Sequence, residues 1–397
     1  MASIEKRTRN GRTRWYTRYR DPSGKQCTRT FDRKVDAQRH LTSVESAKQG
    51  GVYIDPSRAK VTMGEWSKRW LAGTAHLKPS TRERYEGILR AHILPRWRTT
   101  NLDNISHSAV QAWVTELSKE LQPATVRKVH RVLSLILTLA VKDGRLVRNS
   151  ATDINLPRVR STEQRYLTHQ QVHALARAAA APDIPSKHRR IAERYTDQYR
   201  LIVLFLAYTG VRFGEMAALR VGRIDFLRRR LVVAESVTLV GSQQVWGTPK
   251  GHERREVPLP SFLVEELATH VQGRAPDDLV FTGVRGQGAL RAPIFRRAAF
   301  DRAAAAIGRP GLHPHELRHT AASLAIASGA DVKLVQRMLG HKSATMTLDQ
   351  YGHLFDDRLN DVADRLDVAA RAADVYPLCT RPEIVDLDSK RGEATAQ

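Results

Sequence analysis

The chain has 397 residues and a mass of 44.7 kDa, more than one hydrophobic core usually organises, so we expect two or three domains. Hydrophobic residues make up 41% of the chain and charged residues 27%, which excludes disorder over most of its length. The 65 Lys and Arg residues against 41 Asp and Glu give a net charge of +24, which favours a polyanionic partner, nucleic acid first and an anionic membrane surface second.

Neither apolar runs nor cysteines point to a membrane or an extracellular setting. The longest apolar run, Leu201 to Tyr208, is far shorter than the roughly 20 residues that cross a bilayer, and a polar, basic stretch follows Met1. Cys27 and Cys379 lie near opposite ends of the chain, so neither a disulfide framework nor a cysteine zinc site is expected. We therefore expect a cytoplasmic protein without a membrane partner.

Residues 1–55 are expected to form a small β-sheet packed on one helix. Basic residues alternate with aromatic residues or Thr from Arg12 to Arg20, a turn follows at Asp21 to Gly24, and the alternation resumes from Lys25 to Phe31. This pattern predicts a hairpin, with residues 3–9 as a first strand and a helix from about Lys34 to Lys48.

One face of this sheet would present a row of basic side chains, as a ribbon that lies in a DNA groove does. Residues 1–50 hold thirteen Lys or Arg against five Asp or Glu. The alternative is an ordinary solvated face, because basic residues are common on edge strands. The candidate DNA-binding residues of this face are Arg12, Arg14, Arg18 and Arg20.

Residues 60–155, after a linker marked by Gly50-Gly51 and Asp55-Pro56-Ser57, are expected to form an all-helical domain. Apolar residues recur three and four apart in Met63–Leu71, Thr81–Ile93, Ser106–Leu117 and Pro123–Asp143. Exposed basic groups on these helices could clamp DNA or could simply keep the domain soluble. The candidates for DNA contact are Arg82, Arg127, Lys128 and Arg131.

Residues 165–375, which follow a linker from Asn149 to Thr162, are expected to form an α-rich domain. Thr168 and Gln171 have the capping-box spacing of a helix start. Segments from Arg229 to Val240, Gln244 to Lys250 and Arg254 to Pro260 predict an inserted three-stranded β-meander, with turns at Gly241 and Gly251. Residues 376–397 are expected to be a mobile tail, so the predicted fold is multidomain and mainly α.

This third segment also contains residues that could handle a phosphodiester. Arg212 follows Thr209-Gly210-Val211 where a loop meets a helix start, and Lys250 lies in a turn between strands. The helix beginning near His315 places that residue, Arg318 and His319 near one face. His341 follows Leu339-Gly340, and Tyr351 is ten residues further on. Singly, each has a structural explanation, such as an ion-pair partner, a helix cap or a core aromatic residue.

The sequence from His315 to His319 also matches H-E-x-x-H, in which two histidines one helical turn apart bind zinc and Glu activates water. It would indicate a metalloprotease. Pro314 just before the motif and the strongly basic chain argue against this interpretation, and a pattern with three fixed positions also arises by chance.

Four boxes resemble those of the tyrosine recombinases in order and approximate spacing, and are most similar to integrases of actinobacterial phages and integrative elements. These boxes are TGVRFGE, TPKGHERR, HELRHTAASLAIASGADVKLVQRMLGH and MTLDQYGHL, within residues 166–360. The two N-terminal segments match the family only in layout, as an arm-type DNA-binding domain and a core-binding domain.

The resemblance implies that Tyr351 is the nucleophile, which forms a 3′-phosphotyrosyl bond, and that His315 accepts or relays its proton. It implies two phosphate-binding arginines, a histidine donor and a general acid on a β-hairpin. It implies no metal and no other cofactor. The matching positions for these roles, with the H-x-x-R pair included, are Arg212, Lys250, His315, Arg318, His341 and Tyr351.

By the same resemblance, the expected function is site-specific integration and excision of phage or mobile-element DNA through a Holliday junction, close to the nucleoid of a bacterial host. The expected partners are double-stranded DNA with core and arm attachment sites, a DNA-bending host factor and an excision factor. A type IB topoisomerase is the enzyme alternative. A chromosome-dimer resolvase usually lacks the added N-terminal domain, and a non-catalytic DNA-binding regulator would not need the full set of residues.

Exchange of four strands needs four nucleophiles, so we expect a homotetramer on DNA. An apolar stripe at helical spacing follows Tyr351 and could pack on a neighbouring catalytic domain or on its own. The stripe consists of Leu354, Phe355, Leu359, Val362, Ala363 and Leu366.

Overall fold

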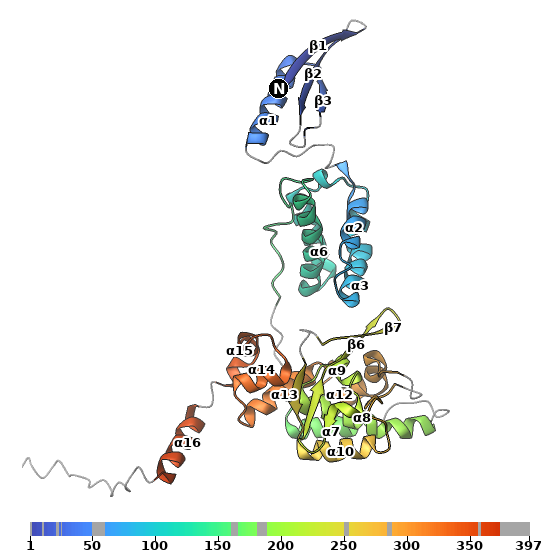
Figure 1. The fold of residues 1–397 in the computed structure, drawn as a ribbon, viewed down its shortest axis with the longest axis vertical. Helices are drawn as coiled ribbons and strands as arrows, with labels where there is room; N and C mark the ends of the chain where they lie inside the picture. Colours follow the sequence, from blue (N-terminus) through green and yellow to red (C-terminus); the bar gives the residue numbers. More distant parts are fainter. Residues whose placement is uncertain are drawn as a thin grey trace, which may run out of the picture. The chain divides into compact units, whose positions relative to one another are not determined.

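The computed structural model describes residues 2–9, 12–20, 24, 26–49, 60–159, 166–180, 189–249, 254–283, 288–355 and 359–373. These residues form mainly helices with small antiparallel sheets (Figure 1). They fall into two compact units, residues 1–163 with 239–245, and residues 164–238 with 246–397. Each unit is described by itself.

A three-stranded antiparallel sheet of β1 (Ser3–Arg9), β2 (Arg12–Arg20) and β3 (Gln26–Phe31) begins the first unit, and α1 (Lys34–Gln49) packs on it. These are the strands and the helix that the alternating pattern predicted. Tyr19 faces the helix, where it is buried with Leu41 and Val44. Successive residues of a strand point to opposite faces, so the four predicted arginines of β2 line the face away from α1.

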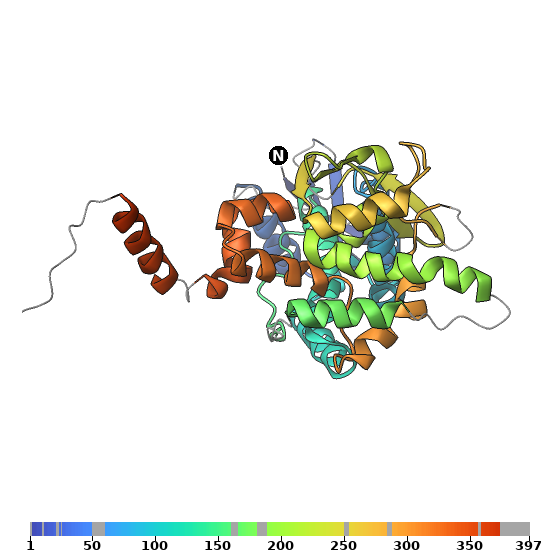
Figure 2. The same ribbon diagram turned by 90° about the horizontal axis from the view of Figure 1, so that it is seen from below.

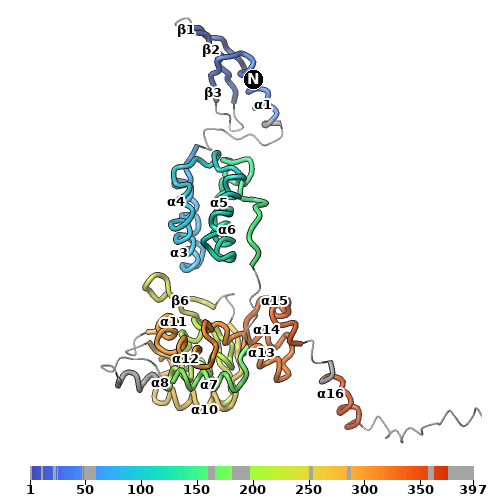
Figure 3. Tube along the Cα trace, turned by 180° about the vertical axis from the view of Figure 1, so that it is seen from behind, coloured from blue at the N-terminus to red at the C-terminus, as the bar shows by residue number. Residues whose placement is uncertain are grey.

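The helical part of the first unit is drawn as a tube in Figure 3, and its longest helix buries residues three and four apart, as the sequence pattern predicted. Thr62 and Glu65 form a capping box that starts the first of these helices. The buried tryptophans Trp66, Trp70, Trp97 and Trp113 share one core with aliphatic residues, and the Trp66 indole donates to the Ile136 carbonyl at 3.1 Å. The helices are α2 (Met63–Ala72), α3 (Pro79–Ile88), a π-helical turn η2 (Leu89–Ile93), α4 (Leu94–Trp97), a 3₁₀ turn η3 (Leu102–Asn104), α5 (His107–Glu120) and α6 (Pro123–Lys142).

The second unit is built around α8 (Arg189–Thr209), whose apolar run from Leu201 to Ala207 is almost completely buried. In Figure 2 this helix, in light green, lies beside its neighbours α7 and α10. The predicted capping box of Thr168 and Gln171 begins α7. The remaining helical elements are α7 (His169–Ala179), α9 (Phe213–Ala217), η5 (Val221–Arg223), α10 (Ser261–Val271), α11 (Ala292–Phe295), η7 (Arg296–Phe300), α12 (Asp301–Ala306), α13 (Glu316–Ala327), α14 (Val332–Leu339), α15 (Ala344–Tyr351), η8 (Gly352–Leu354) and α16 (Leu359–Ala372).

The predicted three-stranded meander is wrong in its pairing. The segment from Arg229 to Val240 is not one strand, because it breaks at Ala234-Glu235 into β5 (Arg230–Val233) and β6 (Ser236–Val240). β5 pairs with β4 (Ile224–Asp225) and with β8 (Arg255–Pro258), whereas β6 pairs with β7 (Gln243–Gly247). At the break, Glu235 accepts a hydrogen bond from Arg220 at 3.2 Å.

Several sequence predictions lie wholly or partly outside the described residues: the turn from Asp21 to Gly24, the linker around Gly50 to Ser57, the end of the linker from Asn149 to Thr162, the turn with Lys250, and the C-terminal tail 376–397. Among the helices that the structure describes, none is both long enough and apolar enough to span a membrane.

Candidate active site

Arg212 directly precedes α9 and is held there by Glu215. The Glu215 carboxylate accepts from the Arg212 backbone N–H at 2.9 Å through Oε2, and from the Arg212 side-chain Nη1 at 2.9 Å through Oε1. Gly210, two residues earlier, has a φ of +64°, a conformation that residues with a Cβ rarely adopt. The predicted position of Arg212, where a loop meets a helix start, is confirmed.

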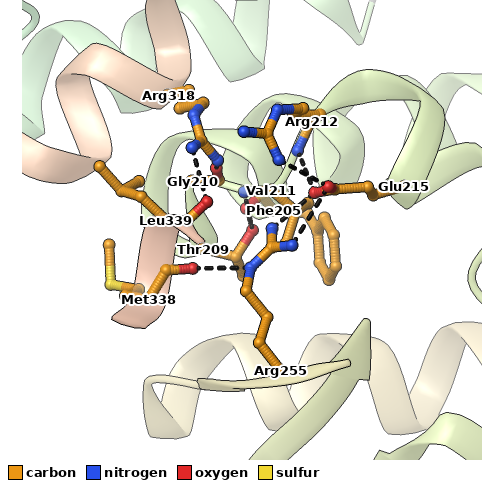
Figure 4. Close-up of polar contacts among 10 residues, drawn as sticks. All are labelled: Phe205, Thr209, Gly210, Val211, Arg212, Glu215, Arg255, Arg318, Met338 and Leu339. Atoms are coloured by element: carbon orange, nitrogen blue, oxygen red, sulfur yellow. Dashed lines mark hydrogen bonds and ion pairs between the residues drawn. The ribbon is translucent and has the colours of Figure 1, made fainter. Parts of the chain in front are cut away.

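Arg255 of β8 reaches the same carboxylate from the opposite side (Figure 4). Its Nη1 and Nη2 donate to Oε1 and Oε2 of Glu215 at 3.1 and 2.5 Å, and its Nε donates to the Met338 carbonyl at 3.0 Å. Burial by itself raises the pKa of Glu215, but the hydrogen bond and charge of Arg255, followed by Arg212, bring that pKa below its ordinary value. Glu215 is therefore an ionised, buried anchor between two arginines.

Arg318 of α13 is 4% exposed and points at two backbone carbonyls. Its Nη1 donates to the Gly210 carbonyl at 2.7 Å, and its Nη2 donates to the Leu339 carbonyl at 2.6 Å. A Cβ on Gly210 would lie 2.7 Å from a Leu339 side-chain carbon, so only glycine allows this close approach. Burial and the nearby Arg212 charge lower the pKa of Arg318 to about 9, and the guanidinium stays charged at neutral pH.

Tyr351, the last residue of α15, is fully buried. Its hydroxyl lies 2.9 Å from Nδ1 of His319 on α13, and its ring stacks in parallel with that of His341 at 6.4 Å between centroids. Burial raises the pKa of Tyr351 to about 12, although the Arg318 charge acts in the opposite direction. The hydroxyl is therefore a neutral phenol at physiological pH.

His341 follows Gly340, which ends α14 in the left-handed conformation with a φ of +66°. A Cβ on Gly340 would lie 2.9 Å from the Arg255 side chain, which excludes larger residues there. Nδ1 of His341 is 3.0 Å from the Thr347 hydroxyl. Burial, then the charges of Arg318 and Arg212, lower the pKa of His341 to about 4. The imidazole is therefore neutral at pH 7 and keeps one N–H donor.

The structure brings four of the six sequence-predicted residues together: Arg212, Arg318, His341 and Tyr351. His315 is exposed and precedes α13 as its N-cap, and its ring meets that of His319 edge-on at 5.5 Å. Lys250 lies outside the described residues. Sequence reasoning did not predict that Glu215 and Arg255 belong to this site. It also did not predict the contact of His319 with Tyr351.

The H-E-x-x-H match is explained by local structure. The Glu316 carboxylate accepts from the His313 backbone N–H at 2.6 Å, so it caps the turn before α13. In the described part of the chain, no group of three or more His, Cys, Asp or Glu side chains is placed to hold a metal ion.

The arrangement can bind a phosphate and activate a hydroxyl next to it. Two guanidiniums, from different elements, lie around the Gly210-Val211 turn (Figure 4) and can each donate forked hydrogen bonds to an oxyanion. A neutral phenol is within hydrogen-bond distance of an imidazole. This is the equipment for nucleophilic attack at phosphorus.

The candidate DNA-binding residues are on the molecular surface. Arg12, Arg14 and Arg20 of β2 are exposed and Arg18 is half-buried, with Arg18 and Arg7 both paired to Glu5. The four in the helical part, Arg82, Arg127, Lys128 and Arg131, are exposed as well. Arg82 pairs with Glu86 at 3.3 Å, and Arg127 donates to the Pro157 carbonyl.

Two family models match the chain. The model of the phage integrase family matches residues 165–358, and that of the phage integrase N-terminal SAM-like domain matches residues 62–118. The first range holds all the clustered residues described above.

Similar proteins with curated names include integrases and recombinases of actinobacteria and their phages. A putative prophage phiRv2 integrase of Mycobacterium tuberculosis is 28% identical over 362 residues, covering 88% of this chain and 91% of that protein. The integrase of Mycobacterium phage L5 is 25% identical over 87% of this chain and 91% of that protein. The tyrosine recombinase XerC of Mycobacterium bovis is 30% identical over 72% of this chain and 91% of that protein.

Solved structures share the fold at low sequence identity. The Tn1549 transposon integrase in complex with transposon right end DNA has a TM-score of 0.62 at 20% identity, over 77% of this chain and all of that chain. A lambda integrase dimer bound to a core site has a TM-score of 0.56 at 20% identity, over 89% of this chain and 95% of that chain.

Proposed function

Because the chain belongs to the phage integrase family of tyrosine recombinases and is a tyrosine-type site-specific DNA recombinase, we propose that Tyr351 is the nucleophile that cuts its DNA. One observation carries this assignment: a buried phenol ends α15 beside the arginine whose guanidinium is fixed by the Gly210 and Leu339 carbonyls. A hydroxyl placed beside a fixed cation can attack a phosphate that the cation holds.

Arg212 and Arg318 are the phosphate clamp of this proposal. Each guanidinium keeps its charge at the working pH, so together they offset the charge that develops on the non-bridging oxygens in the transition state. The neutral His341 adds an N–H donor to the same phosphate. Tyr351 then replaces the 5′-oxygen on phosphorus, which conserves the bond energy as a 3′-phosphotyrosyl link.

The proposal gives Lys250 the role of general acid, because the departing 5′-oxygen is a poor leaving group without a proton. His315, at the exposed start of α13, is the remaining residue of the proposed catalytic set. These residues need neither metal nor nucleotide for the reaction, so we expect cleavage to continue in the presence of EDTA. Attack by a 5′-hydroxyl from another duplex reverses the step and joins new partners through a Holliday junction.

In this proposal, residues 1–55 bind arm sites, residues 60–155 bind core sites and residues 165–375 carry out catalysis. Residues 376–397 are a tail. The arginine row on β2 supports the first assignment, because arginines on one sheet face can contact phosphates and base edges in a groove. Exposed basic residues on α3 and α6 support the second.

We further propose that the substrate is phage or mobile-element DNA, that the working assembly is a homotetramer, and that a DNA-bending host factor and an excision factor take part. The curated mycobacterial relatives with phage and prophage names support the first part. One of the solved relatives is a lambda integrase tetramer bound to a Holliday junction, with 20% identity and a TM-score of 0.55, and it supports the second.

The test uses a plasmid that carries the DNA flanking the gene. Purified protein is incubated with this plasmid, and covalent protein–DNA adducts are counted after denaturation. The Tyr351→Phe variant is expected to bind this DNA and to form no adduct. The matched control is Tyr208→Phe, which removes a hydroxyl bonded to His169 elsewhere in the same unit and should form the adduct. An adduct with Tyr351→Phe would overturn the assignment.

A further inference from the structure

Strand β1 contributes an arginine that is not among the DNA-binding residues expected from the sequence. Arg7 lies directly opposite Arg14 of β2, on the sheet face away from α1, and its side chain is 52% exposed. Next to this pair, Arg9 lies opposite Arg12. Like charges directly opposite each other destabilise a sheet. A face that keeps two such pairs is suited to contact with a polyanion.

Glu5 holds Arg7 in a defined orientation. Nε of Arg7 donates to Oε1 of Glu5 at 2.8 Å, and Nη2 of Arg7 donates to Oε2 at 3.2 Å. Oε2 of Glu5 also lies 3.3 Å from Nη2 of Arg18. The Arg7 guanidinium lies over the Tyr16 ring, 5.2 Å from its centroid. A carboxylate and an aromatic ring thus fix this exposed guanidinium from two directions.

The contact with Glu5 uses only one edge of the Arg7 guanidinium. An arginine has five N–H donors in one plane, and Glu5 accepts one from Nε and one from Nη2. Nη1 and the second N–H of Nη2 form another pair of parallel donors on a different edge. Such a pair matches the O6 and N7 acceptors that guanine presents in the major groove.

The charge of Glu5 favours a base contact over a phosphate contact for this arginine. The Glu5 carboxylate is ionised at neutral pH, because the hydrogen bond from Arg7 lowers the pKa of Glu5 below its ordinary value. A carboxylate beside a phosphate repels it and offsets the attraction of Arg7. The edge of a base carries no net charge, so the paired guanidinium can donate both hydrogen bonds there with less repulsion.

We propose that Arg7, oriented by Glu5, reads a guanine of the arm site in the major groove. The ligand is thus a G·C base pair of double-stranded DNA. In this arrangement Arg7 sets the sequence preference, whereas Arg14 and the other arginines of β2 contact phosphates and set affinity and salt dependence. This inference rests on the proposed arm-site function of residues 1–55.

Methylation interference on the DNA flanking the gene locates the guanine, because a methyl group on N7 blocks its contacts in the major groove. Full-length wild-type protein should show interference at guanines inside the footprints that lie outside the crossover region. Arg7→Lys keeps the charge but loses the planar fork, so it should lose interference at one guanine of each such footprint. Arg9→Ala removes a charge from the same strand and face and is the matched control, which should keep every signal.

Binding constants on a duplex with one arm footprint and no crossover site test the same contact. Exchange of the G·C pair for A·T should weaken wild-type binding about 5- to 150-fold, the usual value of one bidentate pair. It should weaken Arg7→Lys much less, because the two changes remove the same interaction. 7-Deazaguanine, which lacks only the N7 acceptor, should act in the same direction. Arg9→Ala should lose affinity for both duplexes by the same factor and show a smaller salt dependence.

Glu5→Gln separates orientation from charge. Loss of a negative charge alone would strengthen binding to both duplexes by the same factor, whereas loss of the fixed guanidinium should reduce the preference for G·C. We expect the reduced preference, with circular dichroism confirming that each variant is folded. An unchanged preference in either Arg7→Lys or Glu5→Gln would overturn the inference. A wild-type protein that leaves no footprint outside the crossover region would instead overturn the arm-site assignment, so the two failures are distinguishable.

Discussion

Arg255 and Glu215 form a two-point ion pair in which both carboxylate oxygens are engaged, and their side chains are only 10% and 1% exposed. Glu215 also holds Arg212, so the pair ties β8, near the expected Lys250 turn, to the start of α9. Arg255 extends the tie to α14 through the Met338 carbonyl, three residues before His341. The two residues thus fix the start of α9, where Arg212 lies, and the end of α14, which His341 follows.

Arg255→Leu is expected to lower the free energy of unfolding by about 3–5 kcal/mol, because it leaves a buried carboxylate with one cation fewer. The double variant Arg255→Leu, Glu215→Leu should lose less than the sum of the two single variants, since no buried carboxylate is left without Arg255. Urea unfolding followed by circular dichroism measures all four corners of this cycle. Strict additivity would contradict a coupled pair.

The pH dependence of stability should report Glu215. Its folded pKa lies below the ordinary value of 4.5, so its stabilising contribution is complete above that pH and is lost as the pH falls through the folded value. The difference in unfolding free energy between wild type and Glu215→Gln should therefore be largest above pH 4.5 and shrink below it. A difference that stays constant into the acid range would show that Glu215 is not ionised in the fold.

The titration of His341 should give the stability a second dependence on pH, above the range in which Glu215 acts. Its folded pKa of about 4 lies below the ordinary 6.5, so between these values the unfolded chain binds a proton that the folded chain does not. Stability should fall as the pH decreases through this range. His341→Trp keeps an N–H donor and cannot titrate, so its unfolding free energy should depend less on pH there. An unchanged slope between pH 6.5 and 4 would contradict the assigned neutrality.

The sequence was informative where the signal is local. Strands of the N-terminal sheet alternate in polarity with a period of two, and Thr168 with Gln171 marks a helix start, so their limits could be predicted. Arg212, Arg318 and Tyr351 belong to short boxes with a known order. Their meeting in space is a property of the second unit, in which α13 packs on α8.

The contacts that sequence could not supply are those between distant segments. Glu215 and Arg255 are forty residues apart, and neither position alone indicates a partner. The strand pairing failed for the same reason, since β5 skips β6 and β7 to pair with β8. In the sequence, His319 follows Arg318 directly and lies one helical turn after His315, so the spacing alone did not tell which histidine contacts Tyr351. The structure shows that contact for His319.

The N-terminal sheet should bind arm DNA through the face away from α1. Arg14→Ala is expected to weaken binding and to reduce the salt dependence of the binding constant by about one phosphate contact. The matched control is Lys6→Ala, which removes the same charge from the neighbouring strand but on the other face, where Lys6 lies over the Trp15 ring. Footprinting and salt titration compare the two. Equal losses would mean that the sheet contributes only net charge.

The last prediction concerns the apolar stripe after Tyr351, which the structure divides. Leu354 and Phe355 pack against the core of their own unit, whereas Val362 and Leu366 on α16 are 53% and 66% exposed. Exposed apolar residues at helical spacing are typical of a surface that another chain covers.

Truncation before Asp356 should therefore keep DNA binding and the folded core but abolish four-subunit complexes and recombination. Val362→Asp with Leu366→Asp should do the same without shortening the chain, and Asp367→Asn, on the same helix, is the control that keeps the stripe intact. A truncated protein that still assembles on a native gel and recombines normally would assign α16 to its own unit.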